Sequence, residues 1–416
     1  MTRADGPRLD TISPMPAFDP FRAHRYAPGT ALTEVIAPPY DVLSDADTDE
    51  LARRSEHNIV HVDVPRGGDD RYEAAAATLA GWLDAGVLVT DPEPSFTIYR
   101  MGFADAAGNP REVVGVLGSL EVVDENAGGV LPHERTTPKA RTDRLDLTRA
   151  TGTNLSPVWG LSLAHGLTAA LAEPGQPVGT LVVDGVTHRV ERVVDPDRLA
   201  EISRIVGSDD VLIADGHHRY AIARVHRDEV RAASGRTDTP AEGTLAFVNE
   251  LVEDQLSVAA IHRVYSGITP DDLAAALAHH FDLAPAPDPT SATLDEMVET
   301  GRLVLLTADG AKWLTPKPDA FVGVRALDGA WLEHALADAD PNSPGPRPQV
   351  DYQHDLGQVA DLVASGAVAA AVLIRPTSIV EIERTAREGL LMPPKSTFFT
   401  PKLRTGFVLR PLDPAE

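Results

Sequence analysis

One stretch of the sequence restricts the fold more than any other, because it joins an apolar run to a helix-like segment through a single glycine. Val211 to Ala214 is apolar and predicts a buried strand, and residues 217–230 carry apolar side chains at helical spacing. Asp215 and Gly216 stand between them. Glycine lets a backbone turn tightly and lets a ligand come close to it. The chain is therefore expected to contain a strand, a tight turn and a helix in direct succession.

Strand-like and helix-like segments alternate along the rest of the chain. Residues 196–206 are amphipathic and predict a helix, whereas residues 58–64 alternate between apolar and polar and predict a strand. Two further strand-like segments, 177–183 and 186–194, flank an Asp-Gly pair, which is typical of a hairpin. Strands joined partly by helices and partly by turns predict a mixed α/β, or α+β, protein.

The order of helix-like, strand-like and Pro-rich segments changes along the chain, which predicts a division into domains. We expect a flexible tail at residues 1–20, a main catalytic α/β domain at 21–265, an inserted α+β subdomain at 266–345, and a C-terminal segment at 346–416 that completes the main domain. A strand is expected at residues 258–264 and a Pro-rich connector at 285–289.

The charge balance limits the partners. The chain has 37 basic and 62 acidic residues, which give a net charge of −25. Such a surface repels nucleic acid and anionic membranes, so neither is expected as a partner, and any anion site must be built locally from particular cations. There is no cysteine, which excludes a disulfide framework and a thiolate nucleophile. The lack of cysteine also fits a cytoplasmic protein, which is what we expect. No apolar run is long enough to cross a bilayer.

Three widespread motifs are absent from the sequence. GxGxxG, GxxxxGK(S/T) and GxSxG do not occur. The chain is therefore not expected to use the dinucleotide fingerprint, the P-loop or the nucleophile elbow of α/β hydrolases.

The turn at Gly216 is the first candidate site. Backbone N–H groups at a helix start attract anions, and Arg219 adds a planar donor fork suited to phosphate. Asp215, His217 or His218 could bind Mg²⁺ or relay a proton. Alternatively, Asp215 is an ordinary helix cap with partly exposed histidines beside it. A zinc site that combines His217 with a distant histidine and carboxylate is a third possibility.

A second candidate lies in the charged loop Val130 to Lys139. His133 or Glu134 could act as a general base toward a substrate hydroxyl. A solvated loop with ordinary ion pairs explains the same residues equally well.

A third candidate follows two prolines near the end of the chain. Lys395, Ser396, Thr397 and Lys402 combine point charges with small hydroxyl donors, which suits a phosphate clamp. The alternative is a surface turn before the last strand. Asp41 could contact a metal or a ribose, and Asn154 and Ser156 could bind substrate, although all three also suit plain turns.

Two of these stretches carry a resemblance to a known family. ADGHHRY at residues 214–220 and MPPKSTFFTPKLRTG at residues 392–406 match it, and so do APPYDV, NIVHVDVP, VLPHERT and NLSP, in order across nearly the whole chain. On these motifs the chain is identified as a member of a bacterial and archaeal family known as domain of unknown function number one thousand and fifteen. The family brings no established activity.

The Gly216 turn also resembles the phosphate-binding turn of the ParB/sulfiredoxin superfamily. Members of that superfamily bind nucleotide phosphates and include free-serine kinases and nucleotide switches. The resemblance covers Val211 to Tyr220. It implies a ParB/sulfiredoxin-like phosphate-binding core, here with an additional mixed sheet and an inserted subdomain, and ATP or ADP as ligand. Sulfiredoxin chemistry needs a cysteine and a chromosome-partition protein needs a basic face, so the composition speaks against both.

These observations predict phosphoryl transfer between a nucleotide and a small hydroxylated metabolite such as free serine. Gly216 to Arg219 would hold the phosphates, Asp215 or a histidine would place Mg²⁺, Glu134 would act as base, and Lys395 would neutralise developing charge. A metal-dependent phosphoester hydrolase and a nucleotide-sensing regulator without turnover are the alternatives. The substrate and the oligomeric state are left open.

Overall fold

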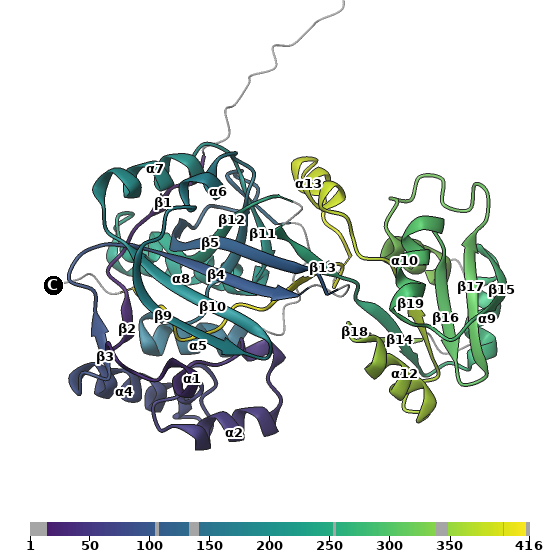
Figure 1. Cartoon of the computed structure of the whole chain (residues 1–416), viewed down its shortest axis with the longest axis horizontal. Coiled ribbons are helices and arrows are strands. Elements are labelled where there is room, and N and C mark those ends of the chain that lie inside the picture. The colour runs from purple at the N-terminus through teal and green to yellow at the C-terminus, as the bar shows by residue number, and fades with distance from the viewer. Residues whose placement is uncertain are drawn as a thin grey trace, which may run out of the picture.

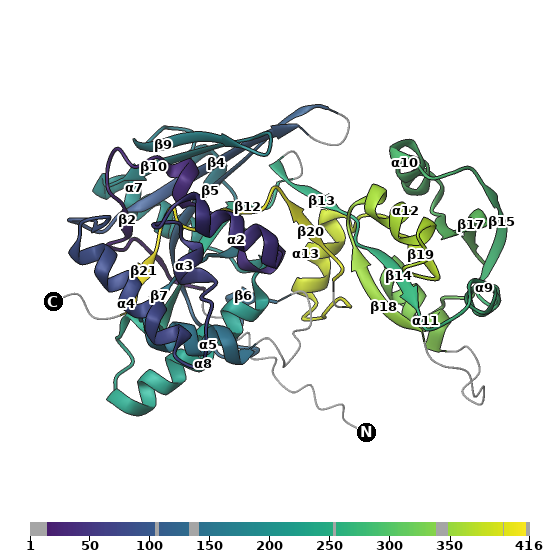
Figure 2. The same cartoon turned by 90° about the horizontal axis from the view of Figure 1, so that it is seen from below.

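The chain folds into two lobes (Figures 1 and 2). The computed structural model describes residues 15–104, 108–132, 141–252, 255–337, 348–393 and 395–412. We call residues 262–373 the small lobe and the rest of the described chain the large lobe. The chain enters the small lobe after β13 (Ser257–Ala259) and returns to the large lobe through β20 (Phe398–Thr400). These two strands pair antiparallel and form a neck between the lobes.

A mixed sheet organises the large lobe. Its strand order is β6-β11-β8-β12-β5-β4-β10-β9, and β1 pairs with β5. The strands are β1 (Phe18–Asp19), β4 (Phe96–Ala104), β5 (Pro110–Glu121), β6 (Val130–Leu131), β8 (Val158–Ser162), β9 (Gln176–Val183), β10 (Val186–Val193), β11 (Val211–Asp215) and β12 (Gly243–Glu250). β12 runs parallel to β8, whereas β11 runs antiparallel to it. The expected mixed α/β class is confirmed, and Phe18 and Asp19 belong to the sheet although they were expected in a tail.

Both faces of this sheet are covered, because successive residues of a strand point to opposite sides. On β4, Ile98 enters one hydrophobic core and Tyr99 the other. The covering helices are α1 (Leu32–Val35), α2 (Asp45–Arg54), α3 (Val60–Asp63), α4 (Arg71–Asp84), α5 (Arg141–Thr151), α6 (Leu167–Ala170), α7 (Pro196–Val206) and α8 (His217–Ser234). The predicted hairpin is confirmed as β9–β10, and its turn residues Asp184 and Gly185 both have positive φ, as a type I′ turn requires.

The small lobe has its own sheet, with the order β15-β17-β16-β19-β14-β18. Its elements are β14 (His262–Ser266), α9 (Pro270–Leu277), β15 (Phe281–Ala286), α10 (Ser291–Thr300), β16 (Leu303–Thr307), β17 (Gly310–Pro316), α11 (Asp328–Ala337), β18 (Gln349–Gln353), α12 (Leu356–Ala364) and β19 (Ala370–Leu373). Three of these strands, β14, β18 and β19, lie wholly or mostly outside the expected insert at 266–345. Strand pairing is non-local, so the apolar pattern could not assign them to a sheet.

Three segments differ from their predicted local structure. Within residues 58–64, Val60–Asp63 form the one-turn helix α3 rather than a strand, because Oδ1 of Asn58 accepts from the backbone N–H of Val60 and starts the turn. The expected strand at 258–264 is divided into β13 and β14. The expected connector at 285–289 begins within β15, whose Pro285 is tolerated because β15 is an edge strand.

Helix α13 (Ile379–Arg387) links the two lobes through ion pairs. Arg325 of the small lobe donates to Glu381 and Glu388 at 2.5 and 2.9 Å. Arg387 of the same helix lies 3.3 Å from Asp209 in the large lobe. Within the described ranges, no helix has the length and apolar character that a bilayer crossing requires.

Candidate functional site

The predicted strand–turn–helix is present at Gly216. β11 ends at Asp215 and α8 starts at His217, and Gly216 between them has φ 86° and ψ 28°. This left-handed conformation is one that side-chain-bearing residues rarely adopt. Gly216 stands at the N-cap and has no side chain with which to cap the helix, so the first backbone N–H groups of α8 depend on other acceptors.

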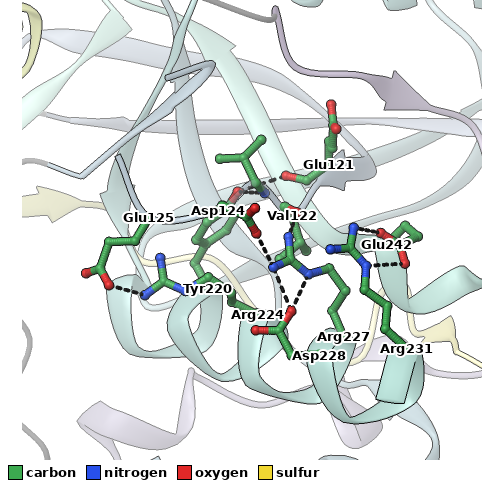
Figure 3. Close-up of polar contacts among 11 residues, drawn as sticks. Glu121, Val122, Asp124, Glu125, Tyr220, Arg224, Arg227, Asp228, Arg231 and Glu242 are labelled. Atoms are coloured by element: carbon green, nitrogen blue, oxygen red, sulfur yellow. Dashed lines mark hydrogen bonds and ion pairs between the residues drawn. The ribbon is translucent and has the colours of Figure 1, made fainter. Parts of the chain in front are cut away.

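Arginines and a tyrosine anchor α8 along its length (Figure 3). The buried guanidinium of Arg227 donates to the carbonyl of Val122 and, at 2.5 Å, to Asp124. The hydroxyl of Tyr220 donates to the carbonyl of Glu121 and accepts from the N–H of Val123, both at 2.9 Å. The helix is thereby fixed to the segment after β5, so its N-terminus is held in place.

The carboxylate of Asp215 is the electrostatic centre of the turn. Its Oδ2 accepts from Nζ of Lys402 at 2.7 Å, and its Oδ1 accepts from the N–H of Gly216 at 2.7 Å. Nη2 of Arg219 lies 3.8 Å from the same Oδ1. Burial alone would raise the pKa of Asp215, but Lys402 and Arg219 outweigh it and lower the pKa well below its usual value. Asp215 is therefore the shared counter-ion of two cations.

Arg219 contacts a backbone carbonyl as well as the carboxylate of Asp215. Its side chain is 11% exposed, and its Nη1 donates to the carbonyl of Pro157. Burial lowers the pKa of Arg219, but Asp215, Asp41 and further acidic groups outweigh this effect and raise it. The guanidinium thus stays charged, although two of its contacts are structural.

Two segments from earlier in the chain, which contain Tyr40 and Asp63, also lie near Arg219. The guanidinium of Arg144 lies 3.9 Å from the ring centroid of Tyr40 and donates to the side chain and carbonyl of the buried Asp63. Asp63 and Tyr40 both act electrostatically on Arg219. Tyr40, Asp63 and Arg219 come from the motifs APPYDV, NIVHVDVP and ADGHHRY, so distant motifs meet at α8.

A small cavity lies behind Arg219. It holds about 40 Å³ and is lined in part by Arg144, Ser156, Arg219 and Thr244. This space suits a water molecule rather than a phosphate. Asn154 borders it, but its Oδ1 accepts from the N–H of Leu245 at 3.0 Å, so that side chain has a structural contact.

The third predicted cluster divides between two places. Lys402 reaches Asp215, whereas Lys395 is exposed with φ 59°. Ser396 is buried, and its hydroxyl donates to the carbonyl of Pro393 at 2.7 Å. Thr397 is half-buried beside it. Ser396 therefore stabilises its own turn, which differs from its predicted part in a phosphate clamp.

The remaining predicted residues have different outcomes. His217 and His218 are half-buried in the first turn of α8. His133 and Glu134 lie outside the described residues. In the described part of the chain, no group of three or more His, Cys, Asp or Glu side chains has the arrangement of a metal site. Both oxygens of Asp215 already accept from protein donors, and Lys402 would repel a cation, so Asp215 does not fit the predicted Mg²⁺. The metal role of His217 stays a prediction.

Sequence reasoning missed two contributors. Asp63 was expected on a strand, and Arg144 lies in a helix without a recognisable motif. The position of Asp63 in NIVHVDVP, a stretch already matched to the family, was the signal that could have marked it.

Several solved protein structures are similar to this chain. A free serine kinase in complex with AMP is similar to the chain at 14% identity and a TM-score of 0.37, covering 65% of this chain and 83% of that one. A mutant free serine kinase in complex with ADP has 13% identity and the same TM-score. SbnI from Staphylococcus aureus has 15% identity and a TM-score of 0.39, covering 71% and 87%.

The sequence comparisons identify a family. No curated protein matches the chain significantly. Residues 18–330 match the model of a family described as protein of unknown function, DUF1015, which confirms the family expected from the motifs. The chain therefore belongs to the DUF1015 family.

Proposed function

We propose that the turn at Gly216 binds a phosphate of a nucleotide such as ATP or ADP, and that the protein transfers a phosphoryl group between it and a small hydroxylated metabolite. One observation carries the proposal: the start of an 18-residue helix, whose N-cap residue Gly216 has no side chain, lies beside two cations that share one carboxylate. The helix dipole and the cations act on an anion in the same direction.

The donor chemistry at the turn supports a phosphate ligand. An ammonium group has three N–H donors, and Asp215 takes one from Lys402. The other two can turn toward phosphate oxygens without a loss of the ion pair. In a chain with a net charge of −25, a site that holds its cations in place is the arrangement an anionic ligand needs.

The other roles follow from the chemistry of the reaction. Glu134 or His133 in the charged loop, or His217 or His218 at the helix start, would accept the proton of the metabolite hydroxyl. Lys395 would add positive charge from the turn before β20. Free serine is the most specific candidate among small hydroxylated metabolites. Arg219 would contribute its charge while its Nη1 remains on Pro157.

Lys402→Met is the variant that tests the proposal most directly, because removal of Arg219 would also break its contact with Pro157. Isothermal titration with AMP, ADP and ATP should show an affinity at least about tenfold weaker than for the unaltered protein, the equivalent of one lost charged contact. Lys312→Met removes an exposed lysine from β17 and should leave the affinity unchanged.

Turnover is measured separately by ³¹P NMR with ADP or ATP and a set of hydroxylated amino acids. A phosphorylated amino acid that forms only with nucleotide present supports the proposal. Phosphate-ester hydrolysis without nucleotide would instead indicate a hydrolase, and tight binding without product a regulator. Equal nucleotide affinity in Lys402→Met and the unaltered protein would overturn the site itself.

A further inference from the structure

A histidine of the small lobe stacks on a ring of the neck. His354 follows β18, and its ring centroid lies 4.1 Å from that of Phe398 with an interplanar angle of 20°. Phe398 is the first residue of β20 and is half-buried. The contact is between lobes, because His354 belongs to the small lobe and β20 returns the chain to the large lobe.

The same phenylalanine ring lies against a residue of the candidate site. Nζ of Lys402 is 4.3 Å from the Phe398 ring centroid, and it lies over the ring. Because the imidazole already covers one face at 4.1 Å, the ammonium group takes the other face. Lys402 in turn donates to Asp215 at 2.7 Å. His354, Phe398, Lys402 and Asp215 thus form a continuous series of contacts from the small lobe to the Gly216 turn.

We propose that His354 is a positioning residue of the candidate site: by stacking on Phe398 it fixes the ring that holds the ammonium group of Lys402 at Asp215. The inference rests on the proposed function, since it concerns the affinity of the same site for phosphate. It also assigns the small lobe a part in the site, although the lobe lies to one side of the large sheet (Figures 1 and 2).

The physical reason is the freedom of the lysine side chain. A lysine has a flexible four-carbon stem and loses much of its rotamer entropy when it is fixed. The Asp215 carboxylate binds the ammonium group at the end of the Lys402 side chain, and the Phe398 ring limits the directions from which that group can reach Asp215. Without a partner on its other face, that ring can rotate, and the ammonium group follows it.

The charge of the imidazole suits this position. Partial burial lowers the pKa of His354, and Lys402 adds to this effect while Asp355 opposes it. A neutral imidazole can lie on Phe398 without repelling the ammonium group on the far face.

Other contacts keep the two lobes close enough for the stack. Arg263 of β14 donates to the carbonyl of Lys395 at 3.0 Å. The hydroxyl of Thr377 donates to the carbonyl of Ser396 at 3.0 Å. Arg263 therefore binds this segment from the small lobe, and Thr377 binds it from the stretch that follows β19, so the segment that leads into β20 is held beside His354.

The test measures the exposure of Lys402 directly. The full-length protein and its variants are treated with a limiting amount of an amine-acylating ester, and mass spectrometry gives the labelling rate of Lys402 relative to that of exposed Lys312. In His354→Ala the ratio should rise about two- to tenfold, the range that one aromatic pair supplies. His354→Phe keeps a stacking ring and should restore the original ratio. His279→Ala, which removes another exposed small-lobe histidine, should not change it.

Titration with ADP separates this inference from the function on which it rests. If His354→Ala raises the labelling of Lys402 and weakens ADP binding by a similar factor, both hold. If labelling rises but the unaltered protein binds no nucleotide, the positioning role holds and the proposed function fails. If ADP binding depends on Lys402 but His354→Ala changes neither readout, the inference alone is overturned. A ratio in His354→Phe as high as in His354→Ala would also overturn it, because stacking would then not be the cause.

Discussion

Nζ of Lys402 lies 2.7 Å from Oδ2 of Asp215, although 187 positions separate the two residues in the chain. The side chains are 18% and 24% exposed, so the pair is largely removed from solvent. Through this contact the closing motif of the chain completes the turn where β11 meets α8. The turn therefore depends on a segment that follows the whole small lobe in the sequence.

The energetic coupling of this pair can be measured by a double-mutant cycle with Asp215→Asn and Lys402→Met. Removing one partner of a buried pair leaves an uncompensated charge, so we expect each single change to lower the free energy of unfolding by about 2–4 kcal/mol. The double variant should lose less than the sum, with a coupling energy of about 1–3 kcal/mol. Urea unfolding of the four proteins gives these values.

The exposed pair Arg54 and Glu50 on α2 is the matched control. Its two charged groups lie 2.9 Å apart, similar to the buried pair, but the side chains are 36% and 64% exposed. Its coupling should not exceed about 0.5 kcal/mol. A coupling as small as this at Asp215 and Lys402 would mean that their contact adds no more to stability than a surface ion pair does.

Two glycines at opposite ends of α8 separate backbone strain from a local clash. Gly216 has φ 86°, and an added Cβ would lie 2.9 Å from Nε of Arg219. Gly235 has φ 69°, and a Cβ there would meet nothing within 4 Å. Gly235→Ala should cost about 1–2 kcal/mol of unfolding free energy from strain alone. Gly216→Ala should cost more and should also weaken ADP binding, since Arg219 must move.

Thermal or urea unfolding and ADP titration of both variants check this expectation. Similar losses of stability with no change in ADP affinity would show that the position of Arg219 does not matter for the ligand.

Local patterns predicted the parts of the site that depend on neighbouring residues. Asp215, Gly216 and Arg219 stand within one strand–turn–helix, so spacing alone indicated their arrangement. Lys402 was predicted as a phosphate contact, but its partner Asp215 was not foreseen because the contact is made across the fold. Pairings of this kind depend on which strands meet, and an apolar pattern does not encode that information.

The sequence also failed to predict the local structure of residues 60–63 and the contact of His354. Val60 to Asp63 alternate like a strand, yet one turn of helix buries both valines and the aspartate, because so short a segment satisfies either period. His354 had no motif beside it, and its stack on Phe398 depends on the packing of one lobe against the other.

The anchoring of α8 predicts unequal roles for two of its arginines (Figure 3). Arg227 is 2% exposed and donates to the carbonyl of Val122 and to Asp124. Arg224 lies 3.4 Å from Glu125, whose side chain is 75% exposed. Arg227→Met leaves a buried carbonyl without its donor and should cost about 2–4 kcal/mol of unfolding free energy. Arg224→Met removes a surface pair and should cost less than about 1 kcal/mol.

Chemical denaturation of the two variants, which introduce the same side chain into the same helix, provides the comparison. Equal effects would contradict the view that buried contacts of Arg227 hold the helix.

Buried histidines predict how stability depends on pH. Burial lowers the pKa of His188 in the large lobe and of His262 in the small lobe from 6.5 to about 4. Between these two values the unfolded chain binds protons that the folded chain does not. The free energy of unfolding should therefore fall as the pH drops from 6.5 to 4 and should change little from this cause at lower pH.

Each histidine should contribute on the order of 2–3 kcal/mol to that loss, because one pKa unit corresponds to about 1.4 kcal/mol. His188→Gln and His262→Gln should each show a smaller loss between pH 7 and 4 than the unaltered protein. His279→Gln, at an exposed position, should show the full loss. Urea unfolding at a series of pH values measures the effect. If the two lobes unfold in separate transitions, each buried variant should alter only the transition of its own lobe, and a change in both would instead mean that the neck and α13 join the lobes into one cooperative unit.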